Sequence, residues 1–170
     1  MSISTVIMKD IVEITVVGVS SPYTMYMERG REGNIIAAFG GIVMCRIDDG
    51  VSLIPPPCIV IHQEILDTLS PSEVQFIIGH ECHHMLRHDT YRLLTLTNMI
   101  AELWKEITCD LAGTRSSSAR DGVKALAKLT RFARDNRTPI VTPLLLGRVL
   151  ILASIAMANK LFSYTRTRSH

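Results

Sequence analysis

The chain has 170 residues, of which 47% are hydrophobic and 20% are charged, a composition typical of a globular protein with a sizeable core. Its formal net charge is +2 and Lys and Arg form no block, which argues against nucleic acid as the main partner, since phosphate binding needs clustered basic residues. The four cysteines include no Cys-x-x-Cys pair, so a disulfide framework is not expected and a reducing compartment fits.

The N-terminal segment gives no convincing signal peptide. Lys9, Asp10 and Glu13 interrupt the apolar residues where the hydrophobic region of a signal peptide would run. Together with the cysteine pattern, this leads us to expect a cytoplasmic protein.

The first third of the chain is predicted to form short β-strands, because five segments are rich in β-forming residues and are separated by Gly, Asp and Pro turns. These segments are residues 23–28, 34–39, 43–47, 51–54 and 58–62. Asp48-Asp49-Gly50 between two apolar runs favours a hairpin. Residues 1–62 are therefore expected to be the strand-rich part.

From residue 63 onward the spacing of apolar residues becomes helical, beginning with a short helix over residues 63–69. The next helix has the clearest start signal in the chain. Ser70 is the expected N-cap, Pro71 fits the first helical position, and Glu73 completes a capping box. We expect this helix to continue to about His88.

Three further helices are predicted, over residues 99–114, around residues 123–130 and from Thr142 onward. Residues 63–170 are therefore expected to be helical. Because we find no repeat and no boundary signal, residues 1–170 are expected to form a single α+β domain.

Residues 144–162 are apolar enough to raise the question of a membrane. Arg148 interrupts them near the start and Asn159-Lys160 near the end, so the uninterrupted run is far shorter than the roughly 20 residues that a span requires. We expect a buried or membrane-facing helix here, and peripheral membrane association stays open.

Residues 80–84 read His-Glu-Cys-His-His and contain the pattern His-Glu-x-x-His. Because positions i and i+4 share one face of a helix, His80 and His84 can bind one Zn²⁺. Glu81 is rotated too far to be an equal ligand, but it can act as the general base for a water molecule that attacks a carbonyl. The segment is predicted to be helical from its cap alone, which favours a metal site over exposed histidines.

A catalytic zinc site usually has a third protein ligand and an open position. His88 fails as the third ligand, because it lies about 12 Å from His80 along a straight helix. His83 points to another face, so both are expected to be solvated or to support the site from outside.

The following helix offers Glu102, Glu106 and Asp110, which are spaced by four and share one face. The spacing favours Glu106 as the metal ligand, with Asp110 accepting an N–H from a ligand histidine and fixing its tautomer. Glu102 stays open as the alternative ligand.

Two cysteines lie close to the candidate ligands, Cys82 inside the motif and Cys109 beside Asp110. Cys82 lies on the wrong face for an ion at His80 and His84, and we expect both Cys82 and Cys109 to be small buried packing residues rather than zinc thiolates. Trp104 is expected in the core.

His80-Glu81-x-x-His84 followed by Glu106-x-x-x-Asp110 resembles the gluzincin zinc metallopeptidases of the HtpX and CAAX-prenyl-protease type. Residues 34–40, NIIAAFG, are similar to the Asn-Ala-Phe-Ala-x-Gly strand of that family, and residues 106–112 to its Glu-x-x-Ala-Asp-x-x-Ala. Residues 84–89 also look like the BlaR-type sensor peptidases. The resemblance implies a zincin-like metallopeptidase fold with one Zn²⁺ per chain and Glu106 as the third ligand.

The resemblance also implies that an extended substrate pairs with an edge strand. The residues implied are Ile35, Ile36, Ala37, Ala38 and Phe39. Strand addition fits, because backbone hydrogen bonds hold a peptide with little demand on its side chains.

The chain departs from this family at its C-terminus, which has no Ser/Thr-His-Pro element. The groups that would stabilise an oxyanion are therefore open, and a frayed polar tail is favoured over a role for the candidates Tyr164, Arg166, Arg168 and His170.

Two functions follow from these patterns. The leading hypothesis is a zinc-dependent endopeptidase that hydrolyses a protein or peptide substrate, with Glu81 as general base. The alternative is a non-catalytic or latent zinc-binding regulatory module that uses the same fold to bind a partner segment.

Overall fold

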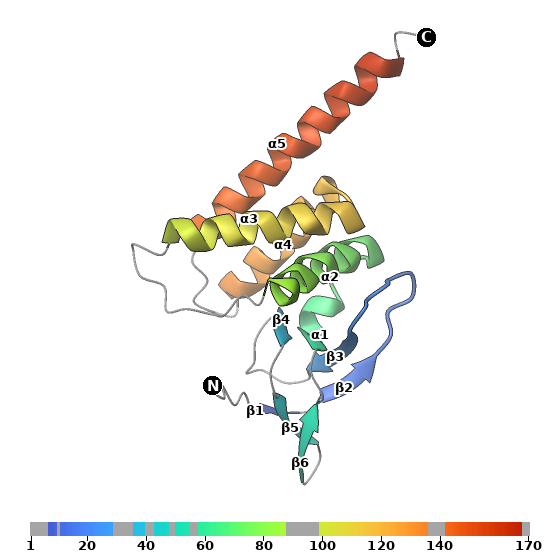
Figure 1. Ribbon diagram of the computed structural model, residues 1–170, viewed down its shortest axis with the longest axis vertical. Helices are drawn as coiled ribbons and strands as arrows, with labels where there is room; N and C mark the ends of the chain where they lie inside the picture. Colours follow the sequence, from blue (N-terminus) through green and yellow to red (C-terminus); the bar gives the residue numbers. More distant parts are fainter. Residues whose placement is uncertain are drawn as a thin grey trace.

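The computed structural model describes residues 7–9, 11–28, 36–39, 43–47, 50–54, 58–87, 99–135 and 142–167. Its strands precede its helices in the chain, so the α+β class predicted from the sequence is confirmed (Figure 1). The described strands are β1 (Ile7–Lys9), β2 (Ile11–Ile14), β3 (Thr24–Glu28), β4 (Ile36–Phe39), β5 (Val43–Ile47), β6 (Gly50–Ile54) and β7 (Cys58–His62). The described helices are α1 (Gln63–Leu66), α2 (Pro71–Leu86), α3 (Met99–Ser116), α4 (Ala119–Asp135) and α5 (Thr142–Thr167).

The strands form two small sheets. One has the order β2-β3-β7-β4, in which β3 and β7 run parallel and β4 runs antiparallel to β7, with Ala37 opposite Val60. Among the described strands, β4 is therefore an edge. The other sheet has the order β1-β5-β6, and Ile47 pairs with Gly50 in the predicted β5–β6 hairpin.

Strands β1 and β2 are absent from the sequence-based prediction. Strand β1 pairs with β5, and β2 pairs antiparallel with β3. The charged residues that break their apolar pattern, Lys9 and Glu13, hide the strand signal, which comes from pairing with other parts of the chain.

Helix α2 is packed from two sides. Its Val74 and Ile78 join a buried cluster with Ile59 and Ile61 of the central strand β7. On another side, its residues and those of α4 and α5 form a second cluster, made of Phe76, Ile77, Ala125, Leu126 and Leu152. Because each fully buried side chain of this size contributes about 1.5–3 kcal/mol, α2 is fixed firmly against both the sheet and the helices.

The first turn of α2 has the predicted capping box. The Glu73 backbone N–H donates to Ser70 Oγ at 3.3 Å, and the Ser70 N–H donates to Glu73 Oε2 at 2.8 Å, with Pro71 in the first turn. Lys128 of α4 donates to the same Glu73 oxygen at 2.6 Å. The helix ends at Leu86 with Arg87 as C-cap, and His88 lies outside the described residues.

Two glycines allow α2 and α3 to approach closely. A Cβ added at Gly79 would lie 3.0 Å from the Gly113 Cα atom and 2.6 Å from Ser116 Oγ. A Cβ added at Gly113 would lie 2.7 Å from the Phe76 carbonyl oxygen. Because side chains at these positions would separate the helices, the glycines determine how near α3 comes to the histidine-bearing turns of α2.

Helix α5 packs on the bundle through its first half and then projects away from it (Figure 1). Its backbone is helical to Thr167, where a frayed tail was expected. Among the described helices, none combines the length and apolar character required to cross a membrane. Trp104 of α3, expected in the core, is 63% exposed.

Candidate metal centre

His80 and His84 lie one turn apart on the same face of α2. Their Nε2 atoms are 3.0 Å apart and their rings are inclined at 71°. His80 is buried and His84 is partly buried. The two imidazoles therefore present one nitrogen each to a common point at the edge of the protein interior.

Glu106 of α3 brings its carboxylate to that point. Its Oε1 atom lies 3.3 Å from His84 Nε2, and its Oε2 atom lies 3.5 Å from His80 Nε2. In a tetrahedral zinc site with bonds of about 2.0–2.1 Å, neighbouring ligand atoms are roughly 3.3 Å apart. Each histidine nitrogen therefore has a different oxygen of the one Glu106 carboxylate at about this spacing, which brings the three side chains close enough to share one ion.

Asp110 lies one turn after Glu106 on α3 and contacts the other nitrogen of His80. Its Oδ1 atom is 2.8 Å from His80 Nδ1, and the residue is only 2% exposed. In this arrangement the Nδ1–H of His80 donates to the carboxylate, which leaves Nε2 as the nitrogen with a free lone pair.

Arg148 of α5 is a member of the cluster that the sequence analysis did not identify. Its Nε and Nη2 atoms donate to the two oxygens of Asp110 at 2.8 and 2.7 Å, and its Nη1 atom lies 2.6 Å from Glu106 Oε2. One guanidinium thus holds two of the carboxylates of α3, those of Glu106 and Asp110. A lone arginine inside an apolar helix was the available signal, because a buried charge requires a partner.

Cys109 is fully buried and contacts the outer nitrogen of His84. Its Sγ atom lies 3.4 Å from His84 Nδ1. His80, His84 and Cys109 also offer three atoms within 4.8 Å of one another, which makes them a second candidate ligand set. The sulfur contacts His84 Nδ1, whereas Glu106 approaches the two Nε2 atoms that face each other.

Glu81 lies beside this cluster with its carboxylate buried. The residue is 7% exposed, and its Oε2 atom has no hydrogen-bond partner among the described residues. Burial raises the pKa of Glu81, partly offset by the positive charge that His80 and His84 can carry. An unpaired buried carboxylate oxygen next to a ligand cluster is the expected state of a group whose partner is a water molecule or a substrate.

The surroundings of the cluster favour a cation. Burial alone would lower the pKa of His84, but its contacts with Cys109 and Glu106 raise it to about 11. Burial would raise the pKa of Glu106, but the hydrogen bond from His84 and the charge of Arg148 lower it to about 2. Both shifts show that the carboxylates at this point stabilise a neighbouring positive charge, which a metal ion would also supply.

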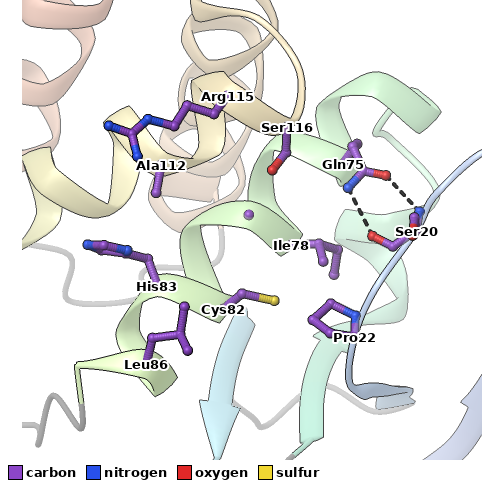
Figure 2. A pocket seen from close by; sticks show the side chains of 11 residues that line it. Ser20, Pro22, Gln75, Ile78, Cys82, His83, Leu86, Ala112, Arg115 and Ser116 are labelled. Carbon is purple, nitrogen blue, oxygen red and sulfur yellow. Dashed lines mark hydrogen bonds between the residues drawn. The ribbon is translucent and has the colours of Figure 1, made fainter.

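Other candidates lie away from this point. Glu102 accepts a hydrogen bond from Lys105 at 2.8 Å instead of joining the histidines. His83 and Cys82 line a groove of about 340 Å³ between α2, α3 and the segment before β3 (Figure 2). Figure 2 also shows the Gln75 amide paired with the backbone of Ser20 at one end of this groove.

The residues predicted to bind substrate fall on β4. Ile36, Ala37, Ala38 and Phe39 form this edge strand, which lies against α2, whereas Ile35 lies outside the described residues. The backbone of α5 includes Tyr164 and Arg166, whose side chains are not described, and Arg168 and His170 lie outside the described residues.

Comparison with known proteins supports a single assignment. The sequence model of Peptidase family M48 matches residues 52–168, which include all the side chains of the cluster and more than half of the chain. No curated protein and no solved structure matches the chain.

Proposed function

The chain belongs to Peptidase family M48, and from that premise we propose that it is a zinc-dependent endopeptidase of the gluzincin type. His80, His84 and Glu106 would hold one zinc ion, and Glu81 would be the catalytic base. The observation that carries the proposal is the meeting of three side chains: the two Nε2 atoms lie 3.0 Å apart, and the two oxygens of Glu106 lie 3.3 Å from His84 Nε2 and 3.5 Å from His80 Nε2.

When bound there, zinc supplies a Lewis acid that polarises the scissile carbonyl and makes water more acidic. Glu81 takes the proton from the attacking water and delivers it to the nitrogen of the leaving amine. Its buried position supports this role, because the raised pKa brings the carboxylate closer to the range in which it both accepts and releases a proton.

Asp110 and Arg148 support the ligands without contacting the reacting atoms. Asp110 accepts the Nδ1–H of His80 and so holds the imidazole in the tautomer that presents Nε2. Arg148 neutralises Asp110 and forms an ion pair with Oε2 of Glu106. The other oxygen of Glu106, Oε1, lies near His84.

We further propose that the substrate binds as an extended strand along β4. The support is the position of β4, an edge among the described strands that lies beside α2, because an edge strand offers backbone donors and acceptors at regular spacing. A peptide that is N-methylated at alternate residues should be cleaved with a higher KM than the unmodified peptide in one register of methylation. Equal KM values in both registers would argue against strand addition.

The central test compares Glu81→Gln and His84→Ala with the parent chain. We expect Glu81→Gln to retain zinc and to hydrolyse a casein-like substrate about 10²–10⁴-fold more slowly, whereas His84→Ala should lose both zinc and hydrolysis. Glu102→Gln serves as control and should resemble the parent, because Glu102 pairs with Lys105 outside the cluster. Hydrolysis by Glu81→Gln at the parental rate would contradict the mechanism.

The same experiment separates the alternative function. A zinc-binding regulatory module would contain stoichiometric zinc in the parent chain but would cleave no peptide. Metal analysis together with an assay on a mixed peptide library therefore distinguishes a peptidase from a module that only binds a partner segment.

A further inference from the structure

We propose that Cys109 is a positioning residue for the metal ligand His84, an inference that rests on the proposed zinc site. Its sulfur accepts a hydrogen bond from the Nδ1–H of His84 and thereby holds the ring with Nε2 facing His80 and Glu106. Cys109 acts through the histidine and does not itself contact the metal.

The contact has the geometry that this role requires. Cys109 Sγ lies 3.4 Å from His84 Nδ1, a usual distance for the long hydrogen bonds of sulfur, which is a weak acceptor. Cys109 is fully buried within α3, so its side chain has little freedom to move away. The opposite nitrogen of the same ring faces His80 Nε2 and Glu106 Oε1.

The arrangement repeats what Asp110 does for His80. Each ligand histidine has its Nδ1 atom against a side chain of α3, and the two side chains come from consecutive residues. Consecutive residues on a helix point about 100° apart. The rings of His80 and His84 are inclined at 71°, so they need acceptors in two directions, which Asp110 and Cys109 provide.

Direct ligation by Cys109 would require a different site. The sulfur lies on the Nδ1 side of His84, and the two ring nitrogens direct their lone pairs to different sides of the imidazole. An ion bound between the Nε2 atoms is therefore on the far side of the ring from Sγ. Cobalt provides a test, because a thiolate ligand would give an intense sulfur-to-cobalt charge-transfer band.

The first measurement is zinc affinity by competition with a chelator. We expect Cys109→Ala to bind zinc about 10–100-fold more weakly than the parent, as is usual when a group that orients a ligand is removed. Cys109→Ser should recover part of this loss, because a hydroxyl can still accept the hydrogen bond. Cys82→Ala is the matched control, since Cys82 lies on α2 but lines the groove on another face, and its affinity should change less than about twofold.

The second measurement reports on His84 itself. In zinc-loaded parent protein, ¹⁵N NMR should show His84 protonated at Nδ1 and bound through Nε2, and the cobalt form should lack the thiolate band. Cys109→Ser should retain this tautomer, and the Tm of the zinc-free variants shows that they are folded.

The outcomes separate the two proposals. A parent chain that binds no zinc would overturn the proposed function and this inference with it. If the parent binds zinc and the Cys109→Ala and Cys109→Ser variants bind it as tightly as the parent does, only the role of Cys109 would be overturned. A thiolate band that Cys109→Ser removes would make Cys109 a ligand and would also overturn the positioning role.

Discussion

The first turn of α2 is held mainly by residues beside it in the sequence, whereas its C-terminal half is held by α3 and α5. At the start, the Ser70 side chain accepts the backbone N–H of Glu73, and the Glu73 side chain accepts the backbone N–H of Ser70. In the C-terminal half, His80 contacts Asp110, which lies 30 residues away, and Asp110 is held by Arg148, 38 residues further on. The helix can therefore begin from local signals, but the candidate metal centre exists only when three helices pack together.

The largest effect is expected when Arg148, the long-range partner of the C-terminal half of α2, is removed. Arg148→Met leaves the buried carboxylate of Asp110 and the partly buried carboxylate of Glu106 without their cation, which should destabilise the zinc-free protein by about 3–5 kcal/mol. Denaturant unfolding measures this loss. Arg131→Met is the control, because Arg131 is exposed and pairs only loosely with Asp135 at 3.8 Å, and it should change stability by less than about 0.5 kcal/mol. Equal effects of the two variants would show that Arg148 is not essential.

The next test changes the distance between the two helices. Gly113→Ala places a Cβ 2.7 Å from the Phe76 carbonyl oxygen, and we expect a loss of about 1–3 kcal/mol together with weaker zinc binding. Gly147→Ala is the matched control, because its Cβ would meet Leu103 at an ordinary 3.6 Å. Replacing that helical glycine should be neutral or stabilise by up to about 1 kcal/mol. If both substitutions changed the free energy of unfolding in the same direction, the close crossing of α2 and α3 would not be what makes Gly113 necessary.

A smaller effect on stability is expected at the N-terminus of α2, which is capped by its own neighbouring residues. Ser70→Ala removes the N-cap acceptor for the Glu73 backbone N–H and should cost about 1 kcal/mol in the free energy of unfolding. Zinc affinity should stay within about twofold of the parent, since the cap lies at the other end of the helix from His84. Ser154→Ala, on the exposed face of α5, provides the control. A large loss of zinc affinity in Ser70→Ala would show that the two ends are coupled.

The smallest effect concerns the pH dependence of the same cap. Burial alone would raise the pKa of Glu73, but hydrogen bonds from Lys128 and Ser70 lower it below its usual value. A carboxylate with a lowered pKa in the folded state adds stability above its unfolded pKa of about 4.3, and this stability is lost as the pH falls through the folded pKa.

Glu73→Gln keeps the capping geometry but removes the charge, so it should cost at most about 1 kcal/mol at pH 7, because Lys128 is partly exposed. The difference from the parent should shrink as the pH falls below about 4. Urea unfolding at both pH values measures this change, with Glu64→Gln on the exposed surface of α1 as control. If the difference in the free energy of unfolding between Glu73→Gln and the parent is equally large at acidic pH, the substitution acts through packing and not through charge.

The same contrast explains what the sequence could predict. The capping box, the β5–β6 hairpin and the His-Glu-x-x-His pattern depend on residues that are close together in the chain. The spacing of these residues in the sequence is therefore enough to predict all three features. The pairing of β1 with β5 and the exposure of Trp104 depend on distant segments, and sequence patterns missed both. The sequence of α5 indicates that Arg148 needs a partner, but it does not identify Asp110 as that partner, because the two residues lie 38 positions apart. Cys109 was predicted to be buried, which is correct, but its contact with His84 depends on the close crossing of α2 and α3.

The position of Arg148 in α5 also has a consequence for the order in which a ribosome delivers the chain. The His-Glu-x-x-His segment emerges early and α3 follows it, but the guanidinium that neutralises Asp110 and Glu106 emerges only with α5. Chains begin to fold from their N-terminal parts during translation. Until α5 has emerged, the nascent polypeptide carries the motif without the cation that completes the cluster. The candidate metal centre would therefore be completed late in synthesis, once α5 can dock on α3.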